Sequence, residues 1–311
     1  MTAAAQIDVR PEIADALCNG RSVVALESTL IAHGLPWPIN LETARAAEQA
    51  IRADGAIPAT IAVVAGRPTV GLGEAELERF ARGKDIVKAS RRELAAVTVQ
   101  KRDAATTVAA TMALALQAGI RVLATGGIGG AHPPLPSSKS PVSWDVSADL
   151  IELARTPVAV VCAGAKSILD LPSTLEILET YSVPVVGFRT DEFPAFYLRT
   201  SGQPVSARAD THEEAAQLLL AHWGFGGAGV VIGQPLPADV AIDPAEFHEA
   251  FSRAAELAAK RGIYRKQLTP FLLRQLAELT AGKSLRANQV LVLENARLAA
   301  RIAAALAVSR T

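Results

Sequence analysis

The chain has 311 residues, half of them apolar, and its 31 Lys and Arg residues balance 31 Asp and Glu residues. This length can bury a substantial core without disulfide bonds, and the balanced charge excludes a bulk positive field for nucleic acid or an anionic membrane. Residues 1–10 lack a secretion signal, and no stretch reaches the roughly 18 apolar residues of a membrane span. We therefore expect a soluble, cytoplasmic protein with no nucleic-acid or membrane partner.

Short β-type runs alternate with amphipathic helical stretches along most of the chain, a pattern typical of a layered α/β domain. We expect strands at Val23–Glu27, Ala59–Val64, Ile86–Lys88, Arg121–Thr125, Pro157–Cys162, Pro184–Gly187 and Gly229–Ile232. We expect helices at Leu41–Ala53, Ala105–Ala118, Thr211–Trp223, Pro244–Arg261, Pro270–Ala281 and Ser284–Ser309. The sequence has no internal repeat or linker, so we interpret residues 1–311 as a single domain. The last helix would cover a sheet face or a subunit interface.

The two cysteines favour a reducing compartment. Cys18 and Cys162 lie far apart in the sequence and match no disulfide or metal-ligand pattern. Cys162 continues the apolar run 158–161, so we interpret it as a packed core thiol.

Glu27 is the first candidate for chemistry, because it closes the apolar run 23–26 at the end of a predicted strand. Ligands of open α/β sheets bind beyond the carboxyl ends of the strands. Burial there would raise the pKa of Glu27 and suit it to general acid work. The alternative is a surface glutamate that caps the next segment. His33, shortly afterwards, is a candidate for the same pocket.

A glycine-rich loop, Thr125–Gly130, follows the predicted strand Arg121–Thr125. Such a loop can aim backbone N–H groups at one point and hold a phosphate without a positive charge. Its spacing fits neither the dinucleotide fingerprint nor the P-loop, which disfavours NAD and ATP. The alternative is a tight structural turn.

The segment that follows is rich in proline between Ala131 and Val142 and is expected to form an irregular loop. His132 and Asp145 flank it, and an oxygen ligand with several waters would suit Mg²⁺ or Mn²⁺, although one carboxylate does not make a metal site. Ser147 is a good N-cap for a helix that begins there, and its neighbouring N–H groups are also able to meet a phosphate.

Lys166 comes directly after the buried run 158–162 and a glycine turn. A lysine in this position can lose its hydration and react as a neutral amine that forms a Schiff base with a sugar aldehyde. The alternative is an exposed lysine at a strand exit. No Ser-His-Asp grouping and no paired carboxylates are evident, so ordinary O-glycosidase chemistry is not indicated.

Taken together, these segments resemble the pseudouridine-5′-phosphate glycosidase family, which includes indigoidine synthase A-like proteins. The similarity spans nearly the whole chain. The matching stretches are Ala25–Pro36, Pro58–Val63, Lys88–Arg92, Ala105–Ala109, Thr125–Gly130, Asp145–Leu150, Val161–Leu171 and Thr190–Phe196.

The resemblance implies a fold, an assembly and a set of roles. The fold is an α/β/α sandwich around a mixed, largely parallel sheet with a helical C-terminal part, and the assembly is a homotrimer. Lys166 is implied to attack C1′ of the opened ribose, Glu27 to donate a proton, and Asp145 to hold Mn²⁺, or another divalent ion such as Mg²⁺, largely through water. The residues implied to contact the substrate or line its pocket are Lys88, Thr107, Val108, Thr125, His132, Ser147, Ala148, Asp149 and Asn288.

The implied reaction is the reversible cleavage of pseudouridine 5′-phosphate to uracil and ribose 5-phosphate. A C–C glycosidic bond has no leaving oxygen to protonate, so an iminium on the opened ribose supplies the electron sink. Lys88 and the glycine N–H groups would anchor the phosphate. We expect Glu27, Lys88, Asp145 and Lys166 to converge on one cleft at the carboxyl ends of the strands.

The chain departs from the resemblance after the glycine loop. Pro133 and Pro134 follow His132 where the family carries His-Arg-Gly, and the loop up to Trp144 and Asp145 is longer by several residues. This change motivates an alternative, a C-ribosylating enzyme (C-glycosynthase) of natural-product biosynthesis that joins ribose 5-phosphate to another aglycone. A second alternative, a non-catalytic ribose-phosphate binder, is opposed by the presence of Lys166 and Glu27.

Overall fold

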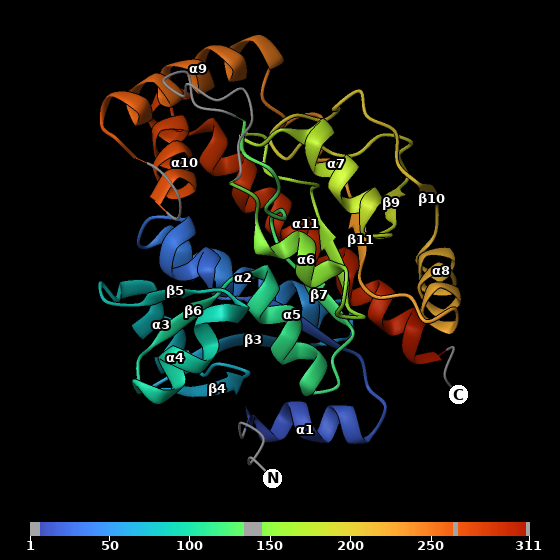
Figure 1. The fold of residues 1–311 in the computed structure, drawn as a ribbon. Coiled ribbons are helices and arrows are strands. Elements are labelled where there is room, and N and C mark those ends of the chain that lie inside the picture. Colours follow the sequence, from blue (N-terminus) through green and yellow to red (C-terminus); the bar gives the residue numbers. More distant parts are fainter. Residues whose placement is uncertain (1–6, 134–144, 264–266, 309–311) are drawn as a thin grey trace.

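An eleven-stranded sheet forms the centre of the molecule, with helices on both faces (Figure 1). The computed structural model describes residues 7–133, 145–263 and 267–308. The main strand order is β1-β4-β3-β2-β7-β8-β11-β9-β10, and β6 joins β3 and β5. The pairings are parallel apart from those of β3 with β4 and with β6. This confirms the α/β/α sandwich around a mixed, largely parallel sheet.

The central strands are continuous apolar runs because helices cover both of their faces. Every predicted strand is present, with small shifts at its ends. The short strands β1, β4, β6 and β10 were not predicted. The strands are β1 (Asp8–Val9), β2 (Val23–Glu27), β3 (Ile57–Val64), β4 (Arg67–Val70), β5 (Val87–Ala89), β6 (Ala104–Thr106), β7 (Val122–Ala124), β8 (Ala159–Cys162), β9 (Val185–Phe188), β10 (Ala207–Ala209) and β11 (Val230–Gly233).

The helices follow the predicted pattern from α2 onward, although α1, α3, α4 and α7 were not predicted. The predicted end of the last helix, Ser309, lies outside the described residues. The α-helices are α1 (Pro11–Cys18), α2 (Ile39–Ala53), α3 (Glu74–Arg82), α4 (Leu94–Val99), α5 (Val108–Gln117), α6 (Ala148–Leu153), α7 (Leu171–Thr180), α8 (His212–Gly224), α9 (Pro244–Lys260), α10 (Leu268–Leu279) and α11 (Lys283–Val308). A π-helical turn, η1 (Leu30–Gly34), and a 3₁₀ turn, η2 (Arg91–Glu93), complete the set.

One predicted boundary was wrong. The stretch Ala105–Ala118 was expected to be entirely helical, but residues 104–106 form β6, and α5 begins at Val108 with Thr107 at its N-cap. Alanine is a good helix former, yet pairing with β3 and β5 places these residues in the sheet. Tertiary pairing therefore overrides local propensity at this point.

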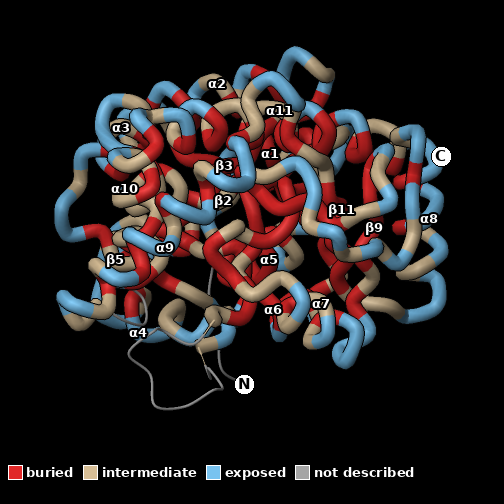
Figure 2. The backbone as a smooth tube through the Cα atoms, turned by 90° about the horizontal axis from the view of Figure 1, so that it is seen from above, coloured by how far each residue is buried: buried red, intermediate tan, exposed pale blue. Residues whose placement is uncertain are grey.

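Helices α2, α8 and α11 cover one face of the sheet, while α5 and α6 lie on the other (Figure 1). Figure 2 shows the buried residues gathered along the central strands, with the exposed residues at the periphery. The 26-residue helix α11 packs along β2, β7 and β8, so it covers a sheet face, one of its two predicted roles. Cys162 is fully buried, as expected for a core thiol. Within the described residues, no helix has the length and apolarity needed to cross a membrane.

The order of the central strands decides where the site forms. β2, β7 and β8 are neighbours and parallel, with Ala25 paired to Leu123 and Leu123 paired to Val160. The carboxyl ends of parallel neighbours meet at one edge of a sheet. Glu27 at the end of β2, Thr125 after β7 and Lys166 after β8 therefore come to the same edge.

Candidate active site

A cavity of about 470 Å³ opens at the edge where β2, β7 and β8 end. The expected convergence of Glu27, Lys88, Asp145 and Lys166 is observed. Every residue that the sequence singled out for the site lines this cavity: Glu27, Lys88, Thr107, Val108, Thr125, His132, Asp145, Ser147, Ala148, Asp149, Lys166 and Asn288.

A larger hollow, of about 760 Å³, lies elsewhere on the molecule. It sits at the outer strands β1 and β4, and the ion pair between Arg10 and Glu76 forms part of its wall. None of the predicted site residues reaches it. Convergence of polar groups identifies an active site better than size alone, so we assign the chemistry to the smaller cavity.

Glu27 has the environment of a general acid. The hydroxyl of Thr125, which follows the neighbouring strand β7, donates a hydrogen bond to its Oε1. Burial raises the pKa of the Glu27 carboxyl above its ordinary value, and the positive charge of Lys166 and the Thr125 hydrogen bond oppose that rise. A carboxyl with a raised pKa keeps its proton at higher pH and can deliver it to a substrate.

Lys166 is held against the glycine loop. Its Nζ donates to the backbone oxygen of Gly127 at 2.6 Å, and its backbone N–H donates to Ile128 O at 3.2 Å. The turn that brings it there needs Gly164, whose φ is +80° and whose missing Cβ would lie 1.8 Å from the oxygen of Pro194. The amine therefore has a fixed position on the cavity wall.

The glycine loop is fastened to helix α11 as well. The side-chain Nδ2 of Asn295, on α11, donates to Thr125 O at 2.8 Å and to Gly126 O at 3.3 Å. Asn295 is only 1% exposed, so these bonds lie inside the core. The C-terminal helix thus supports the loop that carries Thr125 and faces Lys166.

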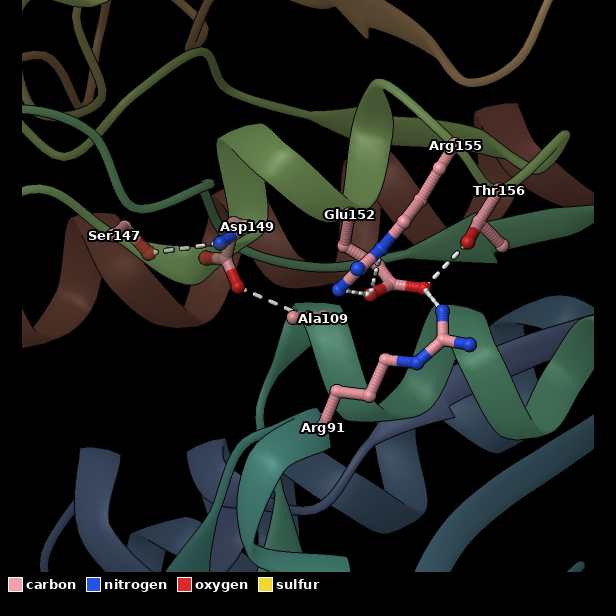
Figure 3. Close-up of polar contacts among 7 residues, drawn as sticks. All are labelled: Arg91, Ala109, Ser147, Asp149, Glu152, Arg155 and Thr156. Carbon is pink, nitrogen blue, oxygen red and sulfur yellow. Dashed lines mark hydrogen bonds and ion pairs between the residues drawn. The ribbon is translucent and has the colours of Figure 1, made fainter.

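Asp149 lines the cavity and also has hydrogen-bond partners within the protein. Its carboxylate accepts hydrogen bonds from the backbone N–H groups of Gly129 and Ala109, each at 2.9 Å. The N–H of Gly129 is thus taken by the protein itself and cannot anchor a phosphate, contrary to expectation at that position. The predicted N-cap is confirmed, because Ser147 Oγ accepts from Asp149 N at 3.2 Å (Figure 3).

Positive and hydroxyl groups gather around Lys88, at the side of the cavity formed by β5 and the start of α5. Ser90 and Arg92 also line this side, although the sequence analysis gave them no role. The sequence feature that could have identified Ser90 and Arg92 is the stretch Lys88–Arg92, which matches the family and contains both residues. Four cavity residues carry a buried polar atom without a hydrogen-bond partner among the described residues: His33 Nε2, Ser90 Oγ, Thr107 Oγ1 and Asn288 Oδ1. Such atoms are ready partners for a bound polar molecule.

His33 and His132 both line the cavity, as predicted. Burial lowers the pKa of His33, and the charge of Lys88 lowers it further. Burial also lowers the pKa of His132, although the charge of Asp145 opposes this. Both imidazoles are therefore neutral hydrogen-bonding groups near pH 7.

The predicted metal position lies beside His132, whose backbone N–H donates to Asp145 O at 2.9 Å. In residues 7–133, 145–263 and 267–308, no three His, Cys, Asp or Glu side chains come together as a metal site. Most of the proline-rich segment, from Pro134, and Trp144 lie outside the described residues. An ion at Asp145 would need further oxygen ligands from water or substrate.

A carboxyl with a raised pKa and a fixed lysine amine, on one cavity at the strand ends, define an α/β enzyme suited to acid and imine chemistry. The chain belongs to the family of indigoidine synthase A like proteins, whose family model matches residues 12–305. This confirms the resemblance drawn from the sequence.

Two relatives show how close the match is. The pseudouridine-5′-phosphate glycosidase of Caldanaerobacter subterraneus is 52% identical over 301 residues, which is 96% of each chain. The enzyme of that name from Roseiflexus is 53% identical over 304 residues, covering 97% of this chain and 96% of the relative.

Two solved structures share the fold. The prealnumycin C-glycosynthase AlnA, in complex with ribulose 5-phosphate, is 39% identical, with a TM-score of 0.89 over 99% of both chains. An indigoidine synthase A-like protein from Thermotoga maritima is 36% identical, with a TM-score of 0.86 over 97% of this chain and 96% of that one.

Proposed function

We propose that this enzyme is a C-glycosidase that reversibly cleaves pseudouridine 5′-phosphate to uracil and ribose 5-phosphate. The observation that carries the proposal is that Glu27 and Lys166 line one cavity in a chain about half identical to glycosidases of that name. The identity extends over nearly the full length of both chains, so the relatives and this protein share one whole enzyme rather than one module.

In the proposed mechanism, Lys166 is the nucleophile and Glu27 is the proton donor when the ribose ring opens. The Lys166 amine attacks C1′ while the ring bond from C1′ to O4′ breaks, and Glu27 gives its proton to O4′. The Glu27 carboxylate then takes a proton from the new C1′–N nitrogen and passes it to C5 of uracil, while the nitrogen lone pair expels uracil and leaves an iminium at C1′. Water hydrolyses the iminium, which releases ribose 5-phosphate and frees the amine for the next turnover.

The phosphate would lie on the side of the cavity formed by β5 and the start of α5. Lys88 and Arg92 supply positive charge there, and the hydroxyls of Ser90 and Thr107 have no hydrogen-bond partner in the part of the chain that the structure describes. Val108, the first residue of α5, lies at a helix N-terminus, which favours an anion. Asn288 and His132 would complete the pocket around the ribose or base.

Asp145 would hold a Mn²⁺ ion, or Mg²⁺ in its place, through water and phosphate oxygens. One carboxylate is compatible with a hard cation that keeps most of its water, and such an ion would neutralise charge on the phosphate. The homotrimeric assembly is also proposed and rests on the family resemblance, and the cytoplasmic location is proposed from the sequence features described above.

A second candidate function is a C-glycosynthase that joins ribose 5-phosphate to another aglycone. The likeness to AlnA, 39% identical and solved with ribulose 5-phosphate, favours it. The higher identity to pseudouridine-5′-phosphate glycosidases, 52%, favours the first candidate.

Borohydride trapping separates these functions. The protein is incubated with ribose 5-phosphate or with pseudouridine 5′-phosphate, reduced, and mapped by peptide mass spectrometry, with Lys166→Arg as the control that keeps the charge but forms no adduct. An adduct on Lys166 with both compounds, together with release of uracil, supports the glycosidase. An adduct with ribose 5-phosphate alone favours the C-glycosynthase, and no adduct with either compound removes Lys166 from the mechanism.

A further inference from the structure

Two walls of the cavity come from segments that are far apart in the sequence. The first wall is residues 88–92, which run from β5 into η2, and the second is residues 147–149, at the start of α6. Among the described residues β5 pairs with β6 alone, so a strand ladder holds the first wall on one side only. The ladder does not reach the second wall, so side-chain contacts contribute to the position of the first wall relative to the second.

Glu152 links the segments that carry the two walls, although it is not itself a cavity residue, and Figure 3 shows its contact with Arg91. It lies on α6, one turn after Asp149, and its side chain is 0% exposed. Nη1 of Arg91, in the first wall, donates to Oε1 at 2.5 Å. Nε and Nη2 of Arg155 donate to Oε2 at 3.2 and 2.9 Å, and the hydroxyl of Thr156 donates to Oε1.

The two arginines differ in what they connect. Arg155 lies three residues after Glu152, just past the end of α6, so their pair stays within the segment that carries the second wall. Arg91 lies 61 residues away in the first wall, so its pair with Glu152 spans both. Burial removes water from the carboxylate of Glu152, and this cost must be offset by nearby positive charge and hydrogen bonds. The ion pair between Arg91 and Glu152 therefore strongly favours one geometry.

We propose that Arg91 and Glu152 are a positioning pair that sets the first wall for recognition of the substrate phosphate, an inference that rests on the proposed function. Neither residue lines the cavity, so neither is a substrate ligand. Arg91 adjoins Ser90 and Arg92, and these side chains move with it. Lys166 is held separately, by Gly127, so loss of Arg91 affects binding of the phosphate more than the bond-making step.

The test compares Arg91→Met with Arg155→Met in the full-length protein. Each variant removes one guanidinium group that is bonded to Glu152. Only Arg91→Met removes the ion pair that connects the first wall to Glu152. The half-saturating concentration of ribose 5-phosphate is measured from the rate of adduct trapping, and hydrogen exchange is measured on the peptide that covers residues 87–94. We expect Arg91→Met to raise half-saturation about tenfold with little change in the maximal rate and to speed exchange in this peptide. Arg155→Met should change neither, and Arg91→Lys should restore part of the loss.

Equal effects of the two methionine variants, or wild-type values for Arg91→Met on both measurements, would overturn the inference. A wild-type protein that forms no adduct would count against the proposed function instead. The exchange comparison still decides the positioning pair in that case, because it needs no substrate. Faster exchange confined to Arg91→Met supports the pair, and unchanged exchange refutes it.

Discussion

The hydroxyl of Thr125 donates a hydrogen bond to the carboxyl of Glu27 and thereby links the ends of the neighbouring strands β2 and β7. This bond favours the ionised carboxylate, so it lowers the pKa of Glu27 against the larger effect of burial. Thr125 thus limits how strongly the carboxyl holds its proton.

Replacing Thr125 with valine should move the alkaline limb of the activity profile to higher pH. The substitution removes a hydrogen bond to the charged form, so the pKa of Glu27 rises further, and a general acid with a higher pKa stays protonated to higher pH. The measurement is kcat/KM across pH. Thr111→Val is the control, because Thr111 donates to Thr106 in the core and not to Glu27. A limb that moves to lower pH contradicts the assignment.

Replacing Glu27 with glutamine should lower activity and raise stability at neutral pH. Activity should fall about 10²- to 10⁴-fold, the range for loss of a general acid. In the wild type, the raised pKa of Glu27 means that the folded state binds this proton more tightly than the unfolded state. Its contribution to stability is present below the unfolded pKa and is lost as pH rises through the folded value.

Thermal unfolding of wild type and Glu27→Gln from acid to alkaline pH checks this second effect. The variant should gain stability relative to the wild type as pH rises, because the amide never ionises. A constant difference across pH would show that burial of Glu27 has no electrostatic cost.

Replacing Gly164 with alanine should destabilise the protein by several kcal/mol and disturb Lys166. An added Cβ would lie 1.8 Å from Pro194 O, and φ is +80°. Gly119→Ala is a matched control, because Gly119 has φ +88° and, among the described residues beyond its chain neighbours, no atom lies within 4 Å of its added Cβ. We expect the control to lose about 1 kcal/mol of stability, because alanine is strained at this positive φ. Urea unfolding of both variants measures the difference, and equal losses would refute the role of the close contact.

Removing divalent metal should reduce activity, and Mn²⁺ should restore it. The proposal gives the ion one protein carboxylate, so Asp145→Asn should raise the Mn²⁺ concentration needed for half-maximal activity roughly tenfold or more. The measurement is turnover after dialysis against a chelator, followed by titration with Mn²⁺ and Mg²⁺. Full activity in the metal-free wild type would rule the metal out.

Much of the fold could be predicted from the sequence because central strands and helices have strong local signals. β2, β8 and β11 are apolar runs with turn residues at their ends, and α9 to α11 have long amphipathic patterns. β1 and β6 are short and depend on their partners, so nothing local marks them. The alanines of β6 even favour a helix by propensity, and only the pairing with β3 and β5 overrides it.

For the site, the sequence predicted which residues come together but not how each is used. Glu27 and Lys166 could be placed because strand ends meet at one edge of a parallel sheet. The hydrogen bonds of Asp149 could not be predicted, because its partners, Gly129 and Ala109, lie 20 and 40 residues away. Glu152 gave no signal either, since its partner Arg91 lies 61 residues away in the sequence.

The bonds from Asn295 to the glycine loop have a consequence for biosynthesis. Glu27 is translated long before Asn295, which belongs to α11. A nascent chain that still lacks α11 has its sheet strands but not the two bonds from Asn295 to the loop that faces Lys166. We therefore expect a chain that ends before Asn295 to be less active than the full-length chain.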